Sequence, residues 1–256
     1  MTRSRLLAVL LGATPFAVIG LAWELAVALG WLNPFFTSRP SAIAAGLAAQ
    51  IATGELVTNL GVSLGEFVVG FGLAAIIGVG LGVLAGWYRT LEYAVDPFLW
   101  FLYSAPLIAF YPVFVIWFGL GPRTVVAIAF LLAAPPIMAN TMSGVKRTDR
   151  DLVRAARAFG ARDRDVFLNV ALPGSVPVMV AGLRLGVGRA LTGVVIAELF
   201  GSTAGLGFSL GYYGQVLRTT DMMVALLVIV ALGVAVTQML SLIEARVDSW
   251  RTGPGH

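Results

Sequence analysis

The sequence predicts an all-α integral membrane protein, and three observations support this fold class. The 256 residues are 59% hydrophobic and only 12% charged, with a mean hydropathy of +0.91. A soluble domain carries about 25% charged residues, so most helices of this chain lack a face suited to water. The apolar stretches are also long and continuous, whereas the strands of a membrane barrel alternate in hydropathy over about 10 residues.

Six stretches are long enough to cross the bilayer, which takes about 20 apolar residues in a helix. They belong to one transmembrane domain covering 1–256, and they run over 6–32, 62–86, 97–119, 124–142, 175–200 and 222–243. The first stretch is much longer than the apolar region of a signal peptide, which has about 7–15 residues. We therefore expect it to remain as a span.

The second, third and fourth spans are rich in glycine and proline. Gly78, Gly82 and Gly86 recur every four residues, a pattern that permits close helix packing, either within the chain or at a seam between two copies. Prolines free helix carbonyls, which then line a path or simply accompany a kink against neighbouring helices. Four prolines interrupt the third and fourth spans, namely Pro106, Pro112, Pro135 and Pro136.

Ionisable side chains at bilayer depth are costly, and they are functional candidates for that reason. Four stand out, namely Glu24, Glu66, Arg189 and Glu198. The functional interpretation is that Arg189 provides positive potential along a path for anions, with Glu66 or Glu198 as its gate partner. The structural interpretation, favoured for the three glutamates, is an ion pair between helices, such as Arg189 with Glu66, or solvation from the membrane edge. Asn140, in the fourth span, completes the candidate path.

The distribution of basic residues predicts the orientation, because cytoplasmic loops carry more Lys and Arg. With the N-terminus inside, twelve basic residues fall in inner segments, and only Arg39, Arg123 and Arg218 fall in outer ones. Both termini are therefore expected in the cytoplasm. The formal charge of +4 follows from this topology, so nucleic acid is not an expected partner.

Several kinds of chemistry are excluded by composition. The chain has no cysteine, and its single histidine is His256, so thiol nucleophiles and most metal sites are absent. Its only lysine, Lys146, does not follow the glycine-rich turn of a P-loop. We therefore expect no catalytic residue, no metal and no cofactor on this chain.

The longest polar connection, 143–174, holds seven basic and four acidic residues. Within it, 149–159 is predicted to form an amphipathic helix that ends at Gly160, because glycine readily adopts left-handed dihedral angles. A second short helix over 163–170 is expected to stop at Leu172-Pro173, because proline cannot continue the helical hydrogen bonds. A basic loop lying on anionic headgroups is the alternative.

The spacing within this loop resembles the EAA signature of binding-protein-dependent ABC permeases. That signature is E-A-A, three residues, G, nine residues, then I-x-L-P. The matching residues are Arg154, Ala155, Ala156, Gly160, Val170, Leu172 and Pro173. In the family this loop is the coupling helix that docks in a groove of the ATPase subunit. We expect Arg157 and Phe159 to make direct contacts with that subunit, and Arg154 departs from the glutamate that the family usually has.

Further motifs resemble the nitrate, sulfonate, taurine and bicarbonate branch of that family. They are Pro106-Leu107-x-x-x-x-Pro112, Ile116-Trp117-Phe118-Gly119-x-Gly121, Pro136-x-x-x-Asn140-x-x-x-Gly144, Glu198-Leu199-Phe200-Gly201 and Gly205-Leu206-Gly207. Glu66 departs from the branch, which often has arginine there. The resemblance implies a six-span permease of the type I importer fold, carrying a small anion such as a sulfonate, nitrate, bicarbonate or carboxylate.

The same resemblance implies the partners and the location. An ATPase dimer would hold ATP and Mg²⁺, and a separate extracytoplasmic binding protein would deliver the solute. A second copy of the chain would complete the path between two subunits. The expected location is the bacterial cytoplasmic membrane.

Two other functions remain as alternatives. A secondary transporter driven by ion gradients would show internal repeats and broken helices that carry charges at mid-membrane, and inspection finds no convincing repeat. An intramembrane enzyme would need a cluster of nucleophile, base or metal ligands, which the lack of suitable His and Cys disfavours.

Overall fold

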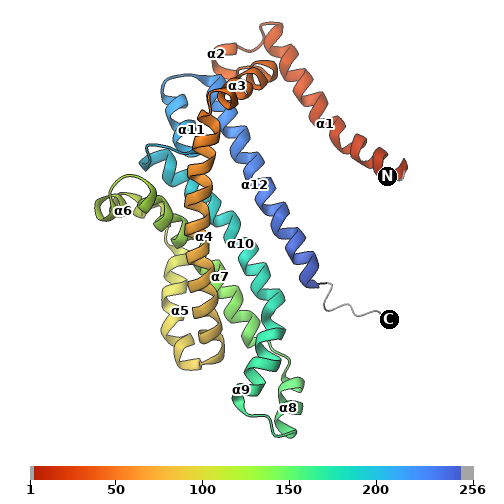
Figure 1. The fold of residues 1–256 in the computed structure, drawn as a ribbon, viewed down its shortest axis with the longest axis vertical. Helices are drawn as coiled ribbons and strands as arrows, with labels where there is room; N and C mark the ends of the chain where they lie inside the picture. The colour runs from red at the N-terminus through yellow and green to blue at the C-terminus, as the bar shows by residue number, and fades with distance from the viewer. Residues whose placement is uncertain (1–2, 249–256) are drawn as a thin grey trace.

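The computed structural model describes residues 3–248, with side chains described for 14–241 except Phe16, and almost all of this chain is helical. Figure 1 shows an elongated molecule. The short helices α2 (Pro34–Thr37), α3 (Pro40–Ala52) and α11 (Leu206–Gln215) lie at one end, and α8 (Arg150–Ala158) and α9 (Asp163–Val166) lie at the other. The long helices connect these two ends.

Four described helical runs are long and apolar enough to cross a membrane. They are α4 (Glu55–Trp87), α7 (Pro122–Lys146), the run from α9 through α10 (Leu172–Gly201), and α12 (Thr219–Asp248) up to Ser241. The first expected span, 6–32, corresponds to α1 (Arg3–Ala28). Residues 3–13 and Phe16 of that helix lie outside the described side chains. Figure 1 shows α1 apart from the bundle, and it contacts α3.

The third expected span, 97–119, is not one straight helix. It divides into α5 (Arg89–Ser104) and the pair η1 (Leu107–Phe110) and α6 (Tyr111–Phe118), and the two halves meet at an angle of 91°. The break falls at Ala105-Pro106, where Pro106 has no N–H to continue the helical hydrogen bonds. The two halves together count as a fifth candidate span.

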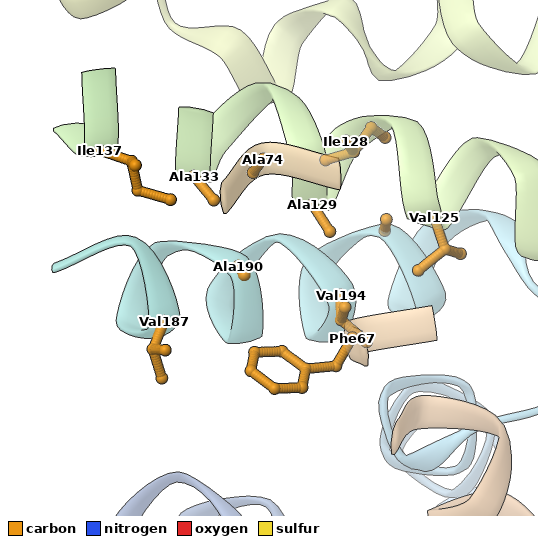
Figure 2. Packing of buried hydrophobic residues seen from close by; sticks show 11 residues of the cluster. Phe67, Ala74, Val125, Ile128, Ala129, Ala133, Ile137, Val187, Ala190 and Val194 are labelled. Carbon is orange, nitrogen blue, oxygen red and sulfur yellow. The ribbon is translucent and has the colours of Figure 1, made fainter. Parts of the chain in front are cut away.

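The core lies where α4, α7 and α10 pack along one another. Figure 2 shows alanine, valine and isoleucine side chains between α7 and α10, with Phe67 of α4 beside them. Glycines bring the backbones close. A Cβ on Gly82 of α4 would lie 2.7 Å from the Met138 carbonyl oxygen, and one on Gly186 of α10 would lie 2.5 Å from Ile137 Cγ1.

The glycine array of α4 therefore packs within the chain. Gly78 and Gly86 also face α7, where an added Cβ would approach Ile137 and Val145 to 3.0 and 2.7 Å respectively. Small residues at such positions allow the close van der Waals contact that holds helices together in lipid. Of the two alternatives, packing inside one subunit is the one that these contacts support.

Hydrogen bonds fasten the short helices to α12 at the α11 end. Ser38 and Thr220 hydroxyls lie 2.8 Å apart, and Gln50 Nε2 donates to Asp221 Oδ1 at 2.9 Å. Ser38 and Gln50 are buried, so these bonds satisfy polar groups that would otherwise be costly. They fix α3 against the start of α12.

Candidate functional site

The polar loop forms a helix, a tight turn and a second helix, as its pattern predicts. The side chain of Asp149 accepts a hydrogen bond from the Asp151 amide at 2.8 Å and so caps α8. At the other end, Gly160 has φ +83 and donates to the Arg157 carbonyl at 2.9 Å, while Ala161 donates to the Ala156 carbonyl at 3.0 Å. These two bonds are the Schellman arrangement, which needs a left-handed residue at the glycine.

Ion pairs hold this turn in shape. Arg157 Nη2 lies 3.0 Å from Asp163 Oδ1 and joins α8 to the start of α9. Arg154, at the position of the family glutamate, lies 3.5 Å from Asp151 within its own helix. Both pairs are exposed, so each contributes at most about 1 kcal/mol to stability. They act mainly by orienting the side chains.

The apolar stripe expected along α8 is divided between two faces. Leu152 and Phe159 are 57% and 93% exposed, while Val153 and Ala156 are half-buried. Ala155 is exposed. The end of the molecule at α8 therefore presents a phenyl ring and a leucine to its surroundings.

The expected stop at Leu172-Pro173 does not occur, and this prediction was wrong. A continuous helical run extends from Asp163 to Gly201, and a π-helical turn η2 (Phe167–Ala171) precedes the proline. Pro173 has no N–H, and its ring crowds the carbonyl four residues earlier. The wider π turn relieves this conflict, so the run continues into α10.

A groove of about 460 Å³ lies between α8 and the start of α10. Its walls include Leu152, Val170 and Pro173. Val170 and Leu172 are half-buried and Pro173 is exposed. Of the signature residues, Val170 and Pro173 line this groove, whereas Arg154, Ala155, Ala156 and Gly160 belong to α8 and its turn.

A second feature is a cavity of about 370 Å³ at the break between α5 and η1. Pro106, Pro135 and Pro136 form part of its wall, and Arg189 of α10 is the only charged residue among the lining residues. Tyr103 also lines it and lies within electrostatic reach of Arg189. The sequence indicated Arg189 and the prolines, but it gave no signal for Tyr103 beyond its place three residues before Pro106.

Glu198 is fully buried and caps α11. Its Oε1 accepts from the Ser63 hydroxyl at 2.6 Å, and its Oε2 accepts from the Gly207 amide at 2.6 Å. Ser63 in turn accepts from the Leu206 amide at 2.9 Å. A carboxylate at a helix N-terminus satisfies free amides and meets the positive end of the helix dipole. A Cβ at Gly205 would overlap this carboxylate, which explains the glycine there.

Glu66 lies beside Glu198 and does not pair with Arg189. Its side chain is 4% exposed, and neither carboxylate oxygen has a hydrogen-bond donor among the described residues. The structural ion pair between Arg189 and Glu66 is therefore not formed. Glu66 and Glu198 belong to the α4–α10–α11 junction, and neither lines the cavity at Arg189.

The remaining candidates have local partners. Glu24 accepts from the Ser41 amide at 2.9 Å and from its hydroxyl at 2.7 Å, and so caps α3. Asn140 donates to the Pro136 carbonyl of its own helix at 2.8 Å and packs against Gly182. Because a Cβ at Gly182 would lie 2.7 Å from Asn140 Cβ, this asparagine sits in the α7–α10 contact and not in the cavity wall.

The long apolar helices define a membrane-spanning protein that carries an exposed polar helical hairpin at one end. Residues 78–249 match the family model of the binding-protein-dependent transport system inner membrane component, and the chain belongs to this family. It is thus an ABC importer permease component of the type I fold.

The relatives agree with this assignment. A putative ABC transporter permease protein of Methanocaldococcus jannaschii is 36% identical, over 90% of this chain and 87% of the relative. The putative aliphatic sulfonates transport permease SsuC of Bacillus subtilis is 30% identical, over 92% and 85%. The taurine transport permease TauC of Escherichia coli is 28% identical, over 91% and 87%.

The fold also matches a solved transporter. An inward-facing structure of the MetNI methionine ABC transporter has a TM-score of 0.68 at 22% identity, and the match covers 77% of this chain and 98% of that chain. At this level of identity the likeness concerns the fold alone.

Proposed function

We propose that this chain is the permease subunit of an ATP-driven importer and that α8, the Gly160 turn and α9 dock on a separate ATPase subunit. Alternating access would follow from movement of this hairpin with the ATPase, because a rigid helix transmits displacement to the helices it contacts. ATP and Mg²⁺ would be held by that partner. The chain itself would form the solute path.

The observation that carries the proposal is the exposure of Phe159. A phenyl ring that is 93% exposed at the tip of a well-capped turn gains stability only when a partner covers it. Aromatic side chains dominate protein interfaces when they fill a pocket of the partner. The exposed Leu152 and the ion pair of Arg157 with Asp163 supply an apolar contact and a fixed shape beside it.

The remaining parts of the proposal follow from the family and from sequence. The α8 end faces the cytoplasm together with both termini, in accord with its basic residues. The α11 end would receive solute from an extracytoplasmic binding protein, in the bacterial cytoplasmic membrane. A second copy would complete the path, and a small anion is the solute class, since named relatives carry sulfonates and taurine.

Co-purification tests the docking surface. The tagged chain is expressed with the ATPase encoded beside it, and retention of the ATPase is measured after detergent extraction. We expect retention by the native chain and loss when 154–160 is replaced by a Gly/Ser linker. Phe159→Ala should weaken retention strongly, whereas Phe36→Ala, at a residue that is 65% exposed at the opposite end, should leave it unchanged.

Two results would contradict the proposal. Equal retention by the native and linker chains would place the docking surface elsewhere. If a well-folded native chain did not retain the ATPase, the proposed interaction with an ATPase subunit would be wrong. Comparable thermal unfolding of the variants in detergent is the control for folding.

A further inference from the structure

We propose that the cavity beside Arg189 binds organic monoanions that have an apolar body, such as short alkanesulfonates and alkanecarboxylates. The inference rests on the proposed transport function and narrows its solute class. Arg189 and Tyr103 would recognise the charged group, and the apolar walls would hold the rest of the molecule. Each step of the argument depends on the residues around this one cavity.

The first step concerns charge. Arg189 is the only charged residue in the cavity wall, and no described carboxylate lies within ion-pair distance of it. Glu198 caps α11 and Glu66 lies beside it, so neither of these two buried acidic residues pairs with Arg189. A guanidinium remains protonated at all physiological pH values. An unpaired charge within a membrane-spanning helix is costly, and a bound anion would offset that cost.

The second step concerns the donors. A guanidinium presents parallel N–H groups that match two oxygens of a carboxylate or sulfonate. Tyr103 reaches the same cavity from α5 and lies within electrostatic reach of Arg189, so its hydroxyl supplies a further donor. The paired N–H donors of the Arg189 guanidinium and the Tyr103 hydroxyl suit one singly charged headgroup. They are too few to replace the hydration shell of a dianion such as sulfate.

The third step concerns size and walls. The volume of about 370 Å³ lies within the range of small-molecule sites, about 300–1,000 Å³. Apolar residues that line the cavity include Leu107, Ile108, Leu132 and Leu185. Burial of a carbon chain there is favourable for each CH₂ group that leaves water. Nitrate and bicarbonate have no such chain, and the site therefore favours organic anions over them.

The fourth step explains why the cavity exists at this place. The 91° bend after α5 turns η1 and α6 away from the line of that helix. Pro106 and Pro136 have no N–H for the carbonyls of Leu102 and Leu132, four residues earlier, and both of these residues line the cavity. Irregular backbone at membrane depth is tolerated where it lines a water-filled cavity. The prolines thus account for the cavity, and Arg189 gives its wall a positive charge.

Equilibrium binding of radiolabelled butanesulfonate to the full-length chain in nanodiscs tests the proposal. We expect saturable binding that unlabelled hexanoate displaces and that equimolar sulfate or butanol does not. Arg189→Gln should weaken the affinity at least about tenfold, a loss of about 1.4 kcal/mol. Arg189→Lys should weaken it less, because charge remains while the fork is lost.

Arg184→Gln is the matched control, because Arg184 is on the same helix and outside the cavity wall. It should leave the affinity within about twofold of the native value, which corresponds to about 0.4 kcal/mol. Tyr103→Phe should give a loss between those of Arg184→Gln and Arg189→Gln. Absence of saturable binding to the native chain, equal affinity in Arg189→Gln, or displacement by sulfate as effective as by hexanoate would each overturn the proposal.

Retention of the ATPase, measured on the same variants, separates this inference from the proposed function. A native chain that retains the ATPase but binds no butanesulfonate keeps the importer assignment and overturns the anion site. A chain that binds butanesulfonate through Arg189 but retains no ATPase overturns the importer assignment and keeps the site. The two failures are therefore distinguishable.

Discussion

Replacement of Gly160 by valine tests whether the turn after α8 transmits movement. Gly160 has φ +83, and an added Cβ would meet nothing within 4 Å. The cost of a side chain there is consequently conformational and not steric. An L-residue in the left-handed region costs about 1–2 kcal/mol, and a β-branched residue costs more. An ordinary L-residue should lower the population of the native turn about 5–30-fold relative to other conformations, and valine should lower it further.

The assay is ATP hydrolysis by the permease–ATPase complex in the presence of binding protein and solute. We expect hydrolysis coupled to transport to be lost in Gly160→Val, intermediate in Gly160→Ala, and near native in Gly160→Asn, because asparagine tolerates left-handed angles. Membrane insertion should be unchanged in all three. The graded series separates a conformational effect from a general loss of folding.

Gly54→Val is the matched control for strain. Gly54 has φ +77 with nothing within 4 Å of an added Cβ, and it precedes α4 at the opposite end of the molecule. The same strain there should reduce stability without uncoupling hydrolysis from transport. If Gly54→Val uncouples as fully as Gly160→Val, or if Gly160→Val hydrolyses ATP like the native complex, the reasoning about this turn is refuted.

Two further predictions concern the α11 end. Gly201→Ala should lower the unfolding temperature in detergent, because a Cβ would overlap the Tyr111 ring, and Tyr111→Ala in the same chain should restore part of the loss; no rescue would contradict the contact. Burial and a hydrogen bond to Glu55 raise the pKa of Tyr213 to about 12, above the ordinary value of about 10. This contact should stabilise the fold below pH 10 and be lost as pH rises through 12, so Tyr213→Phe should flatten the alkaline part of the stability profile; an unchanged alkaline profile in Tyr213→Phe would refute the assignment.

Sequence patterns correctly predicted the secondary structure that depends on interactions between near neighbours in the chain. The helix over 149–159 and its end at Gly160 follow from apolar periodicity and from the glycine, and α8 with its left-handed turn has this form. Pro106 and Pro173 show the limit of such reasoning. Both prolines remove an N–H, yet the chain bends by 91° at the first and continues through a π turn at the second.

The pairing of charges also required the tertiary structure. Sequence placed Glu66, Arg189 and Glu198 at membrane depth, and it left open which of them meet. The fold sets Glu66 beside Glu198 and directs Arg189 to the cavity with Tyr103, because α4, α7 and α10 pack in one particular rotation about their axes. A shift of one helical position would turn each side chain by about 100° about the helix axis and remove it from these surroundings.

The sequence by itself determined the membrane character, the long helices and the exposed hairpin, because these depend on hydropathy and on hydrogen bonding between near neighbours. Only the tertiary structure decided that the glycines of α4 face α7, that Glu198 caps α11, and that a cavity opens at Arg189. These features join residues more than a hundred positions apart in some cases, as Ser63 and Glu198 are. Packing in three dimensions, and not periodicity along the chain, brings such residues together.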